Sequence, residues 1–224
     1  MKVKLISHTR PASVFSFETN MTTLEDLCAY CARVSNPNNQ QRTETSKKLI
    51  KYLIKNKHWS PLEMVNACIE IETTRDIARQ ILRHRSFSFQ EFSQRYADPT
   101  KELEFVTREA RLQDTKNRQN SIEIEDDNEV INNFYAIQSE VIRVAKDAYE
   151  WAIDKGIAKE QARAVLPEGL TMSRLYMNGT IRSWVHYIEL RSANGTQKEH
   201  AEIAMACAVE IAKVFPLIKE LQGE

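Results

Sequence analysis

The stretch from residue 75 to residue 95 most restricts how this chain can fold, because it concentrates one kind of charge in a protein of zero formal net charge. It carries five arginines and no lysine, against two carboxylates. Arg75, Arg79 and Arg83 recur at every fourth position, so a helix would place them on one face. A guanidinium grips phosphate or an amide edge through two parallel hydrogen bonds, which an ammonium cannot do. The stretch therefore predicts a site for an anionic, planar ligand.

A simpler interpretation is that Arg83, His84 and Arg85 only close a helix, where cations suit the carboxyl-terminal end of the dipole. That interpretation accounts for three residues. It does not account for the carboxylate, the two hydroxyls and the further arginines that accompany them within a few turns.

The composition is that of an ordinary soluble protein, with 224 residues of which 42% are hydrophobic and 28% charged. This length predicts a single domain, residues 1–224, with a proper core. Zero net charge argues against a general nucleic-acid binder, and no stretch approaches the roughly 20 apolar residues of a membrane span. The start of the chain is too poor in apolar residues for a signal peptide. We expect a cytoplasmic protein with neither nucleic acid nor membrane as a partner.

Hydrophobic periodicity predicts a helix-rich α+β domain with a small central antiparallel or mixed sheet. Alternation predicts strands at residues 2–6 and 65–71, with a further candidate at 170–178. Helices are expected from Thr22, capped by a box with Glu25, and at 45–57, from about 74, 129–155, 180–191 and 197–215. Residues 97–128 are polar and lack a sustained period, so they are expected to form a long loop, either mobile or functional.

The predicted helix 129–155 has apolar residues spaced alternately four and three apart. That spacing suits packing along a helix of another subunit or in the core of a bundle, and the bundle core is the preferred interpretation. The residues concerned are Val130, Phe134, Ile137, Val141, Val144 and Ala148.

The cysteines and histidines predict no metal site. Cys28 and Cys31 form a C-x-x-C pair, but helical spacing puts both on the apolar face, and burial in the core is the preferred interpretation over a redox or metal site. Cys68 and Cys207 stand alone, and the five histidines are scattered. Phosphate-binding loops, dinucleotide fingerprints and nucleophile elbows are absent from the sequence.

An ordered set of short motifs carries a family resemblance. Arg83-His84-Arg85, followed after seven residues by Ser93, gives the pattern R-H-R-x7-S. Further matches follow in order along the chain: residues 32–35 (ARVS), 58–63 (HWSPLE), 79–80 (RQ), 91–96 (EFSQRY), 162–167 (ARAVLP), 181–184 (IRSW) and 189–191 (ELR). On these motifs the chain resembles the flavin-dependent thymidylate synthases over nearly its whole length.

The resemblance implies an activity and an assembly. Enzymes of this family make dTMP from dUMP, with methylenetetrahydrofolate as the carbon donor and with FAD that NADPH reduces. They are homotetramers whose active sites lie between subunits. No cysteine attacks the base in this family, and Ser93 is accordingly expected to bind rather than to attack.

The resemblance also implies roles for individual residues. Arg191 is expected to be catalytic, pairing with the uracil edge and favouring its ionised form. The expected FAD-binding residues are Ser60, Glu63, Arg83, His84, Arg85, Glu91, Arg182 and His186. The expected dUMP-binding residues are Gln80, Arg83, Glu91, Phe92, Ser93, Gln94, Arg95, Arg163 and Arg191.

Two other functions remain open from the residues alone. The arginines could grip RNA phosphates while Phe87, Phe89 and Phe92 stack on bases, in a nucleotide- or RNA-binding protein without catalysis. Alternatively, the arginines could form salt bridges between the subunits of an assembly protein. Composition and spacing by themselves lead only to a ligand that is anionic and nucleotide-like.

Overall fold

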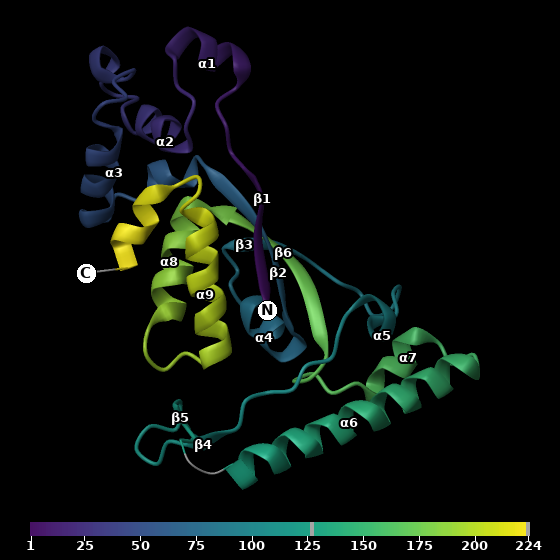
Figure 1. Ribbon diagram of the computed structural model, residues 1–224. Coiled ribbons are helices and arrows are strands. Elements are labelled where there is room, and N and C mark those ends of the chain that lie inside the picture. Colours follow the sequence, from purple (N-terminus) through teal and green to yellow (C-terminus); the bar gives the residue numbers. More distant parts are fainter. Residues whose placement is uncertain (126–127, 223–224) are drawn as a thin grey trace.

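A four-stranded antiparallel sheet runs through the centre of the computed structural model, which describes residues 1–125 and 128–222 (Figure 1). The strand order is β1 (Lys2–His8), β2 (Asn66–Thr74), β6 (Met172–Thr180) and β3 (Phe87–Glu91). β2 and β6 pair along their full lengths, from Asn66 opposite Thr180 to Thr74 opposite Met172. The α+β prediction is confirmed, and the sheet is antiparallel rather than mixed. β3 was not expected, although the alternation of its two phenylalanines is the signal that indicates it.

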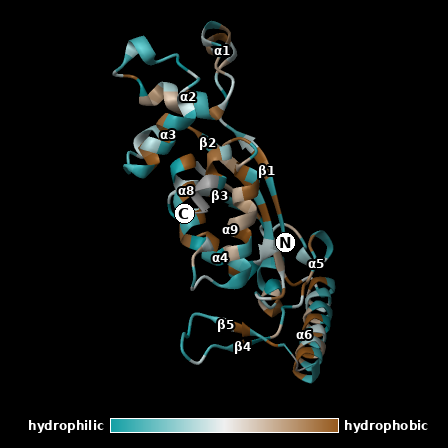
Figure 2. Cartoon of the chain, turned by 60° about the vertical axis from the view of Figure 1, so that its left-hand side comes forward, coloured by the Kyte–Doolittle hydropathy of each residue, from teal (hydrophilic) through white to brown (hydrophobic). Residues whose placement is uncertain are grey.

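Helices α8 (Ile181–Ser192) and α9 (Lys198–Ile211) lie side by side against the sheet, and the short α4 (Arg75–Ile81) closes one end of it (Figure 1). Figure 2 shows hydrophobic residues along the sheet strands beneath these helices. Trp184 is fully buried, and its indole N–H donates to the carbonyl of Ala67 on β2 at 3.0 Å. The helix predicted at 180–191 is confirmed, and its apolar residues Ile181, Val185 and Ile188 are buried together with Trp184.

Gly179 lets β3 approach β6 closely. A Cβ at this position would run into the ring of Phe87 on the neighbouring strand, so any larger residue would push β3 away. The ring of Phe87 also packs edge-on against Trp184, at 4.8 Å between centroids. This contact anchors the start of β3, and with it the Arg83-His84-Arg85 turn that precedes it.

The N-terminal part of the chain adds helices α1 (Ser13–Thr19), α2 (Leu24–Ala32) and α3 (Ser46–Lys55), with 3-10 turns η1 (Pro37–Asn39) and η2 (Ser60–Glu63). The prediction of a Thr22 cap with Glu25 is wrong by one position. Thr23 is the cap: its hydroxyl accepts from the backbone N–H of Asp26 at 3.1 Å, and Glu25 is buried.

Cys28 and Cys207 are buried and Cys31 and Cys68 are half-buried, all four as free thiols. The prediction of core packing is confirmed for Cys28, which lies in the main hydrophobic core. Burial raises the pKa of its thiol to about 12, the neighbouring Cys31 and Glu25 adding to the effect. Such a thiol carries no thiolate near neutral pH, so it is not a nucleophile.

Residues 97–128 have more structure than expected. They contain the helical turn α5 (Pro99–Glu102) and a hairpin of β4 (Arg111–Gln113) and β5 (Ser121–Glu123), while residues 126–127 lie outside the described part. The hairpin is held by charges rather than by apolar side chains, which explains why hydrophobic periodicity does not reveal it. Lys198 at the start of α9, for example, donates to Glu123 at 2.7 Å.

The longest helix, α6 (Asn128–Asp154), extends away from the sheet and packs on α7 (Lys159–Ala162) and the turn η3 (Arg163–Val165) (Figure 1). Its end is confirmed, since Gly156 adopts φ +77°, the left-handed conformation that terminates helices. The preferred prediction of a bundle core is wrong. Five of its six apolar positions are exposed, by 40–62%: Val130, Phe134, Ile137, Val141 and Val144.

The helices α8 and α9 are followed by the final 3-10 segment η4 (Pro216–Gln222), whose first residue is a proline, which cannot continue an α-helix. Within the described ranges, no helix combines the length and apolar character that crossing a membrane requires.

Candidate active site

The Arg83-His84-Arg85 turn joins α4 to β3. α4 ends at Ile81, so the prediction that Arg83 continues the arginine face of this helix is wrong. The chain turns here because Phe87 must reach the sheet. Arg83 and Arg85 are exposed, whereas His84 points inward and is half-buried.

His84 meets Arg191, the last basic residue of α8. The Nε–H of Arg191 donates to Nε2 of His84 at 2.9 Å, and the imidazole packs edge-on against Tyr187 at 4.9 Å. Burial, and then the charge of Arg191, lower the pKa of His84. A neutral imidazole here accepts the hydrogen bond, so it fixes the plane of the guanidinium. Within the described residues nothing takes up the two terminal amino groups of Arg191, which leaves a fork for a ligand edge.

A second group lines a pocket of about 300 Å³ between α4, α7 and the segment after β3. Its guanidinium groups belong to Arg75, Arg79 and Arg163, and its amide to Gln94. Gln94 is only 3% exposed, and its Nε2 has no acceptor anywhere in the described part of the chain. A buried amide without a partner costs free energy unless a ligand supplies one. The pocket therefore suits an anion that also accepts a hydrogen bond from Gln94.

The carboxylates around this pocket hold the arginines in place. Arg79 pairs with Glu168 at 2.5 Å and Arg95 pairs with Glu160 at 3.0 Å. These are exposed pairs, which stabilise a fold only weakly and which a dianion can displace. Their role is then to keep the guanidinium groups near the pocket before a ligand arrives.

Three other predicted site residues follow β3 or end it. Glu91 accepts from the hydroxyl of Ser173 at 2.8 Å and lies 3.9 Å from Arg75. The hydroxyl oxygen of Ser93 accepts from the backbone N–H of Arg95 at 3.3 Å, which closes a turn. Phe92 is half-buried, and its N–H donates to the carbonyl of Arg174 on β6. The turn thus brings the residues after β3, among them Gln94, to the arginine pocket.

Gln80 lies on the inner side of α4, away from that pocket. Its Nε2 donates to Oε1 of Gln197 at 2.8 Å, and its Oε1 lies 3.3 Å from Nδ1 of His200. His200 is fully buried and stands next to His84, with 6.2 Å between ring centroids. Gln80 is therefore grouped with His84 and not with the pocket arginines.

The third group lies at the start of α8. Arg182 pairs with Glu63 of η2, and Ser60 begins the same turn. The ring of His186, one turn further along α8, packs edge-on against Trp59 with 4.4 Å between centroids. Arg182 is half-buried and His186 is exposed, so both lie on the side of α8 that faces away from the sheet.

The predicted residues thus form three separate groups within one chain. Arg182 and Arg191 stand nine residues apart on one helix, which corresponds to roughly 13 Å along its axis. The arginine pocket is instead lined by Arg75 and Arg79 at the start of α4 and by Arg163, the first residue of η3. A ligand as long as a dinucleotide would need contributions from more than one of these groups.

Two pocket arginines, Arg75 and Arg79, belong to the stretch that predicted an anion site, but the family resemblance assigned neither of them a ligand. Their spacing of four residues on α4 is the signal that indicates them, and it is the spacing that drew attention to the stretch. Tyr187, Gln197 and His200 gave no such signal, because nothing in the sequence says which buried polar residues face a site.

No group of three or more histidine, cysteine, aspartate or glutamate side chains in residues 1–125 and 128–222 is arranged to hold a metal ion. The groups described above offer guanidinium, imidazole, amide and hydroxyl donors. That is the chemistry of phosphate and base recognition.

Comparison with known proteins points the same way. Residues 18–217 match the family described as "Thymidylate synthase complementing protein" (Thy1). The "Probable flavin-dependent thymidylate synthase" of Paramecium bursaria Chlorella virus 1 is 48% identical over 221 residues, which is 97% of either chain. The "Flavin-dependent thymidylate synthase" of Synechocystis sp. is 49% identical over 218 residues, again 97% of each. The crystal structure of a UMP/dUMP methylase, PolB of Streptomyces cacaoi, bound with 5-Br dUMP superposes with a TM-score of 0.78. It shares 25% identity, and the alignment covers 98% of this chain and 93% of that one. The chain therefore belongs to the family of flavin-dependent thymidylate synthases.

Proposed function

We propose that this protein is a FAD-dependent thymidylate synthase that converts dUMP into dTMP, with methylenetetrahydrofolate as carbon donor and NADPH as reductant. Membership of the family supports this activity. The observation in the structure that carries it is the pocket beside α4, where arginines surround the unpartnered amide of the buried Gln94. Such a pocket suits a nucleoside monophosphate.

The nucleotide phosphate is bound in this pocket. Arg75, Arg79 and Arg163 supply three positive charges against the two carboxylates at its rim, so the site attracts a dianion. Gln94 gains the acceptor that it lacks in the free chain. The remaining proposed dUMP ligands are Gln80, Arg83, Glu91, Phe92, Ser93, Arg95 and Arg191.

Arg191 acts on the uracil ring. Its Nε–H is held by neutral His84, so its two amino groups form a rigid fork for the carbonyl and imide edge of the base. Negative charge that develops on the ring is stabilised by this cation without any reorganisation. A protonated His84 would repel Arg191, and the lowered pKa of the imidazole prevents this.

The residues proposed to contact FAD fit that group. Arg83 and Arg85 are exposed cations on a short turn, which suits a pyrophosphate. Ser60, Glu63, Arg182, His186, His84 and Glu91 offer hydroxyl, carboxylate, guanidinium and imidazole groups of the kind that adenosine and flavin require. When bound and reduced, FAD supplies the hydride that the methyl group needs. The protein supplies binding, orientation and charge.

The thiols have no part in this chemistry. Burial raises the pKa of Cys28, Cys31, Cys68 and Cys207, so each thiol is more weakly acidic than usual. None lies among the three groups of site residues. A thiolate attack on uracil therefore has no candidate in this chain, and we place no catalytic cysteine.

The active enzyme is a homotetramer with active sites between subunits. Two observations support this proposal. The residues proposed to bind FAD and dUMP fall into separate groups on one chain, at Arg182, Arg191 and Arg163, so we propose that another copy completes each site. In addition, the exposed apolar face of α6 requires cover, which a second copy provides. We also propose that the chain is one domain and works in the cytoplasm.

The burial of the phenylalanines argues against the alternative of an RNA-binding protein without catalysis, because they were the residues proposed to stack on bases. Phe87 is 8% exposed and is enclosed by Trp184 and Tyr187, so it cannot receive a base. Phe89 and Phe92 are half-buried. The alternative of arginines as subunit salt bridges also weakens, because Arg79 and Arg95 pair within their own chain.

The visible absorption spectrum of the purified protein tests the proposal. We expect a yellow protein that bleaches with anaerobic NADPH and regains its colour when dUMP and methylenetetrahydrofolate are added together. Recolouring with only one of the two would contradict the reaction. A protein that stays colourless after incubation with FAD would contradict the cofactor.

A further inference from the structure

A chain of hydrogen bonds crosses the interior from α8 to the start of α9. Tyr187 Oη lies 3.2 Å from Nε2 of His200, and Nδ1 of His200 lies 3.3 Å from Oε1 of Gln80. Gln80 continues to Gln197 at 2.8 Å, and Gln197 continues to Oε2 of Glu199 at 3.0 Å. Each inner member contacts two others, so the five side chains form a single line.

The carboxylate at one end fixes the direction of the whole line. Ionised Glu199 can only accept, so Gln197 must turn its NH2 group toward it. The side-chain oxygen of Gln197 then faces Gln80, so Gln80 must donate to it from its own NH2 group. The oxygen of Gln80 is left facing His200, and His200 must carry its proton on Nδ1. Reversing any one amide would set two donors or two acceptors against each other.

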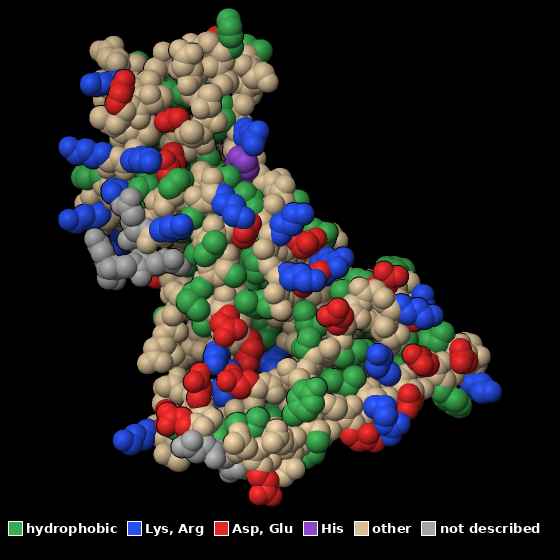
Figure 3. Space-filling view, viewed as in Figure 1, with side chains coloured by type: hydrophobic (Ala, Val, Ile, Leu, Met, Phe, Trp, Pro, Cys, Tyr) green, Lys and Arg blue, Asp and Glu red, His purple; other side chains and the backbone are tan. Residues whose placement is uncertain are grey.

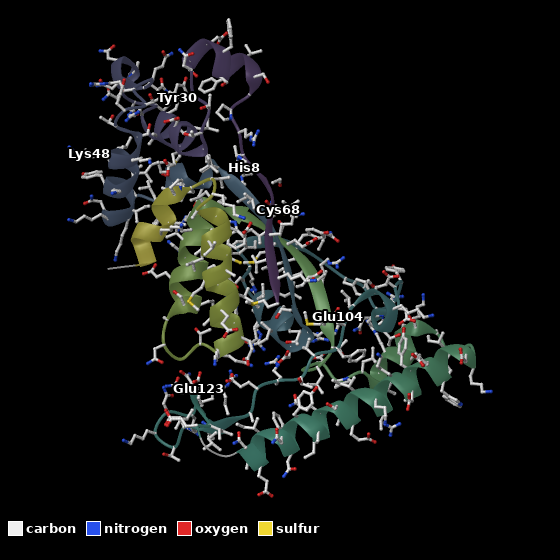
Figure 4. All side chains as sticks on the ribbon, in the orientation of Figure 1. His8, Tyr30, Lys48, Cys68, Glu104 and Glu123 are labelled. Atoms are coloured by element: carbon white, nitrogen blue, oxygen red, sulfur yellow. The ribbon has the colours of Figure 1, made fainter. Side chains whose placement is uncertain are left out.

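Two arginines before and within the hairpin keep Glu199 ionised. Burial alone would raise the pKa of this carboxyl, but its own backbone N–H, Arg111 and Arg108 outweigh that effect and lower it. Arg111 donates to Glu199 at 2.5 Å, and Arg108 approaches it to 3.4 Å. Figure 3 shows acidic and basic side chains gathered where this end of α9 meets the hairpin, and Glu123 is labelled there in Figure 4.

His200 is kept neutral at the other end. Burial lowers its pKa to about 4, and Arg191 and then His84 add to the effect. At neutral pH the ring therefore has one N–H, and the line places that proton on Nδ1. Tyr187 donates its hydroxyl to the remaining lone pair on Nε2.

We propose that Glu199 and His200 are positioning residues that hold the amide of Gln80 in one orientation for dUMP. The inference rests on the proposed function, in which Gln80 contacts the nucleotide. With one N–H used by Gln197 and one lone pair used by His200, Gln80 keeps one N–H and one lone pair for a ligand. Their arrangement is fixed before the ligand arrives, so no binding free energy is spent on ordering the amide.

The tautomer of His200 tests the line without any ligand. We expect ¹⁵N NMR of histidine-labelled protein to show His200 as the Nδ1–H form at neutral pH, with the signal assigned by its loss in His200→Asn. Glu199→Gln removes the acceptor-only end, so a population of the Nε2–H form should then appear. An Nε2–H tautomer in the unmodified protein, or one unchanged in Glu199→Gln, would overturn the proposal.

Binding of dUMP tests the consequence. Glu199→Gln should weaken the Kd for dUMP, measured by calorimetry on the FAD-loaded protein, by about tenfold, the size of one misplaced hydrogen bond. KM for dUMP should rise alongside while kcat changes less than about threefold. Glu202→Gln, on the same helix but outside the line, should bind dUMP as the unmodified protein does. Equal affinities for the two variants would overturn the proposal.

A second pair of variants keeps the test independent of the hairpin ion pairs. His200→Asn retains an N–H for the oxygen of Gln80, whereas His200→Leu retains none. We expect Asn to restore most of the dUMP affinity that Leu loses, at equal FAD content and equal circular dichroism. Identical losses would assign His200 a packing role only. If the unmodified protein fails to bind dUMP, the proposed function is wrong. The tautomer measurement then still shows whether the line of hydrogen bonds has the proposed direction.

Discussion

α8 and α6 are both long amphipathic helices, but only one of them is covered. On α8, Ile181, Trp184 and Ile188 lie against the sheet with at most 2% of their surface exposed. On α6, Phe134 and Ile137 have the same kind of spacing and are 40% and 62% exposed. Helical spacing thus indicates which face of a helix is apolar, but it does not identify what covers that face. For α8 the cover is the chain's own sheet, and for α6 we propose a second copy.

The two helices also use their polar residues differently. The covered helix α8 places Arg191 and Arg182 at its two ends, where each meets a proposed binding group. The helix α6 carries solvated ion pairs on its polar side. It joins the rest of the chain through the buried Ala145, Tyr149 and Ala152 and through one buried amide, Gln138. That amide accepts from the N–H of Arg108 at 2.7 Å and donates to its carbonyl at 3.0 Å.

The largest expected effect is the loss of Trp184. Trp184→Ala removes a fully buried indole and its hydrogen bond, which should lower the free energy of unfolding by about 3–5 kcal/mol. Trp151→Ala makes the same change on α6, where the indole is 59% exposed in the single chain, and should cost less than about 1 kcal/mol when both variants are measured in the dissociating Ile137→Asp background. Urea unfolding followed by circular dichroism measures both. Similar costs would mean that α6 is as well covered within one chain as α8.

Arg191→Ala should keep FAD and lose turnover. The side chain stands at the end of α8, so its removal leaves the packed face intact, while kcat/KM for dUMP should fall about 10²–10³-fold. Flavin absorbance and steady-state kinetics measure the two effects separately. Normal turnover would refute the uracil-activating role, and lost flavin would move Arg191 to the cofactor.

Ile137→Asp should break the assembly without unfolding the chain. A carboxylate in the middle of the apolar face of α6 would be buried without a partner if a second copy covers that face. Analytical ultracentrifugation should then show smaller species, with circular dichroism unchanged. Asn132→Asp adds the same charge on the opposite, exposed side of α6 and should leave the assembly intact. Equal behaviour of the two variants would exclude the apolar face as an interface.

Acid should lower the free energy of unfolding, because His200 is buried in its neutral form beside the sheet. Its pKa is about 4 in the folded chain and near 6.5 when unfolded, so between these values the unfolded state binds more protons. Stability contributed by neutral His200 is therefore present above about pH 6.5 and is lost as the pH falls toward 4. The urea midpoint should drop between about pH 7 and pH 5, and less so in His200→Asn. α6 contains no histidine and adds nothing to this difference. Parallel pH profiles would contradict the burial of a neutral His200.

The sequence predicts those parts of the fold that depend on apolar periodicity. Strand 65–71, the inward face of α8 and the end of α6 near Gly156 follow from spacing and from one glycine. The hairpin at 111–123 was missed because it is held by ion pairs of Arg111 and Lys198, whose partners are distant in sequence.

The candidate site was predictable to a different degree. Motif order names Arg83, Arg163 and Arg191, yet it does not say that they fall into separate groups. The line through His200 and Gln197 could not be predicted, because the direction of a hydrogen bond depends on which polar groups meet in space.

The smallest effect is expected on the solvated side of α6. Arg143 pairs with Glu140 at 2.6 Å and with Asp147 at 2.8 Å, and all three side chains are at least 60% exposed. Water and salt screen such pairs, and ordering three long side chains costs entropy, so Arg143→Ala should leave the unfolding midpoint and the assembly unchanged. The result shows how far around α6 the proposed interface extends from the apolar face. If Arg143→Ala dissociates the assembly as Ile137→Asp does, the second copy extends around the helix well beyond its apolar face, and charge as well as apolar contact holds the copies together.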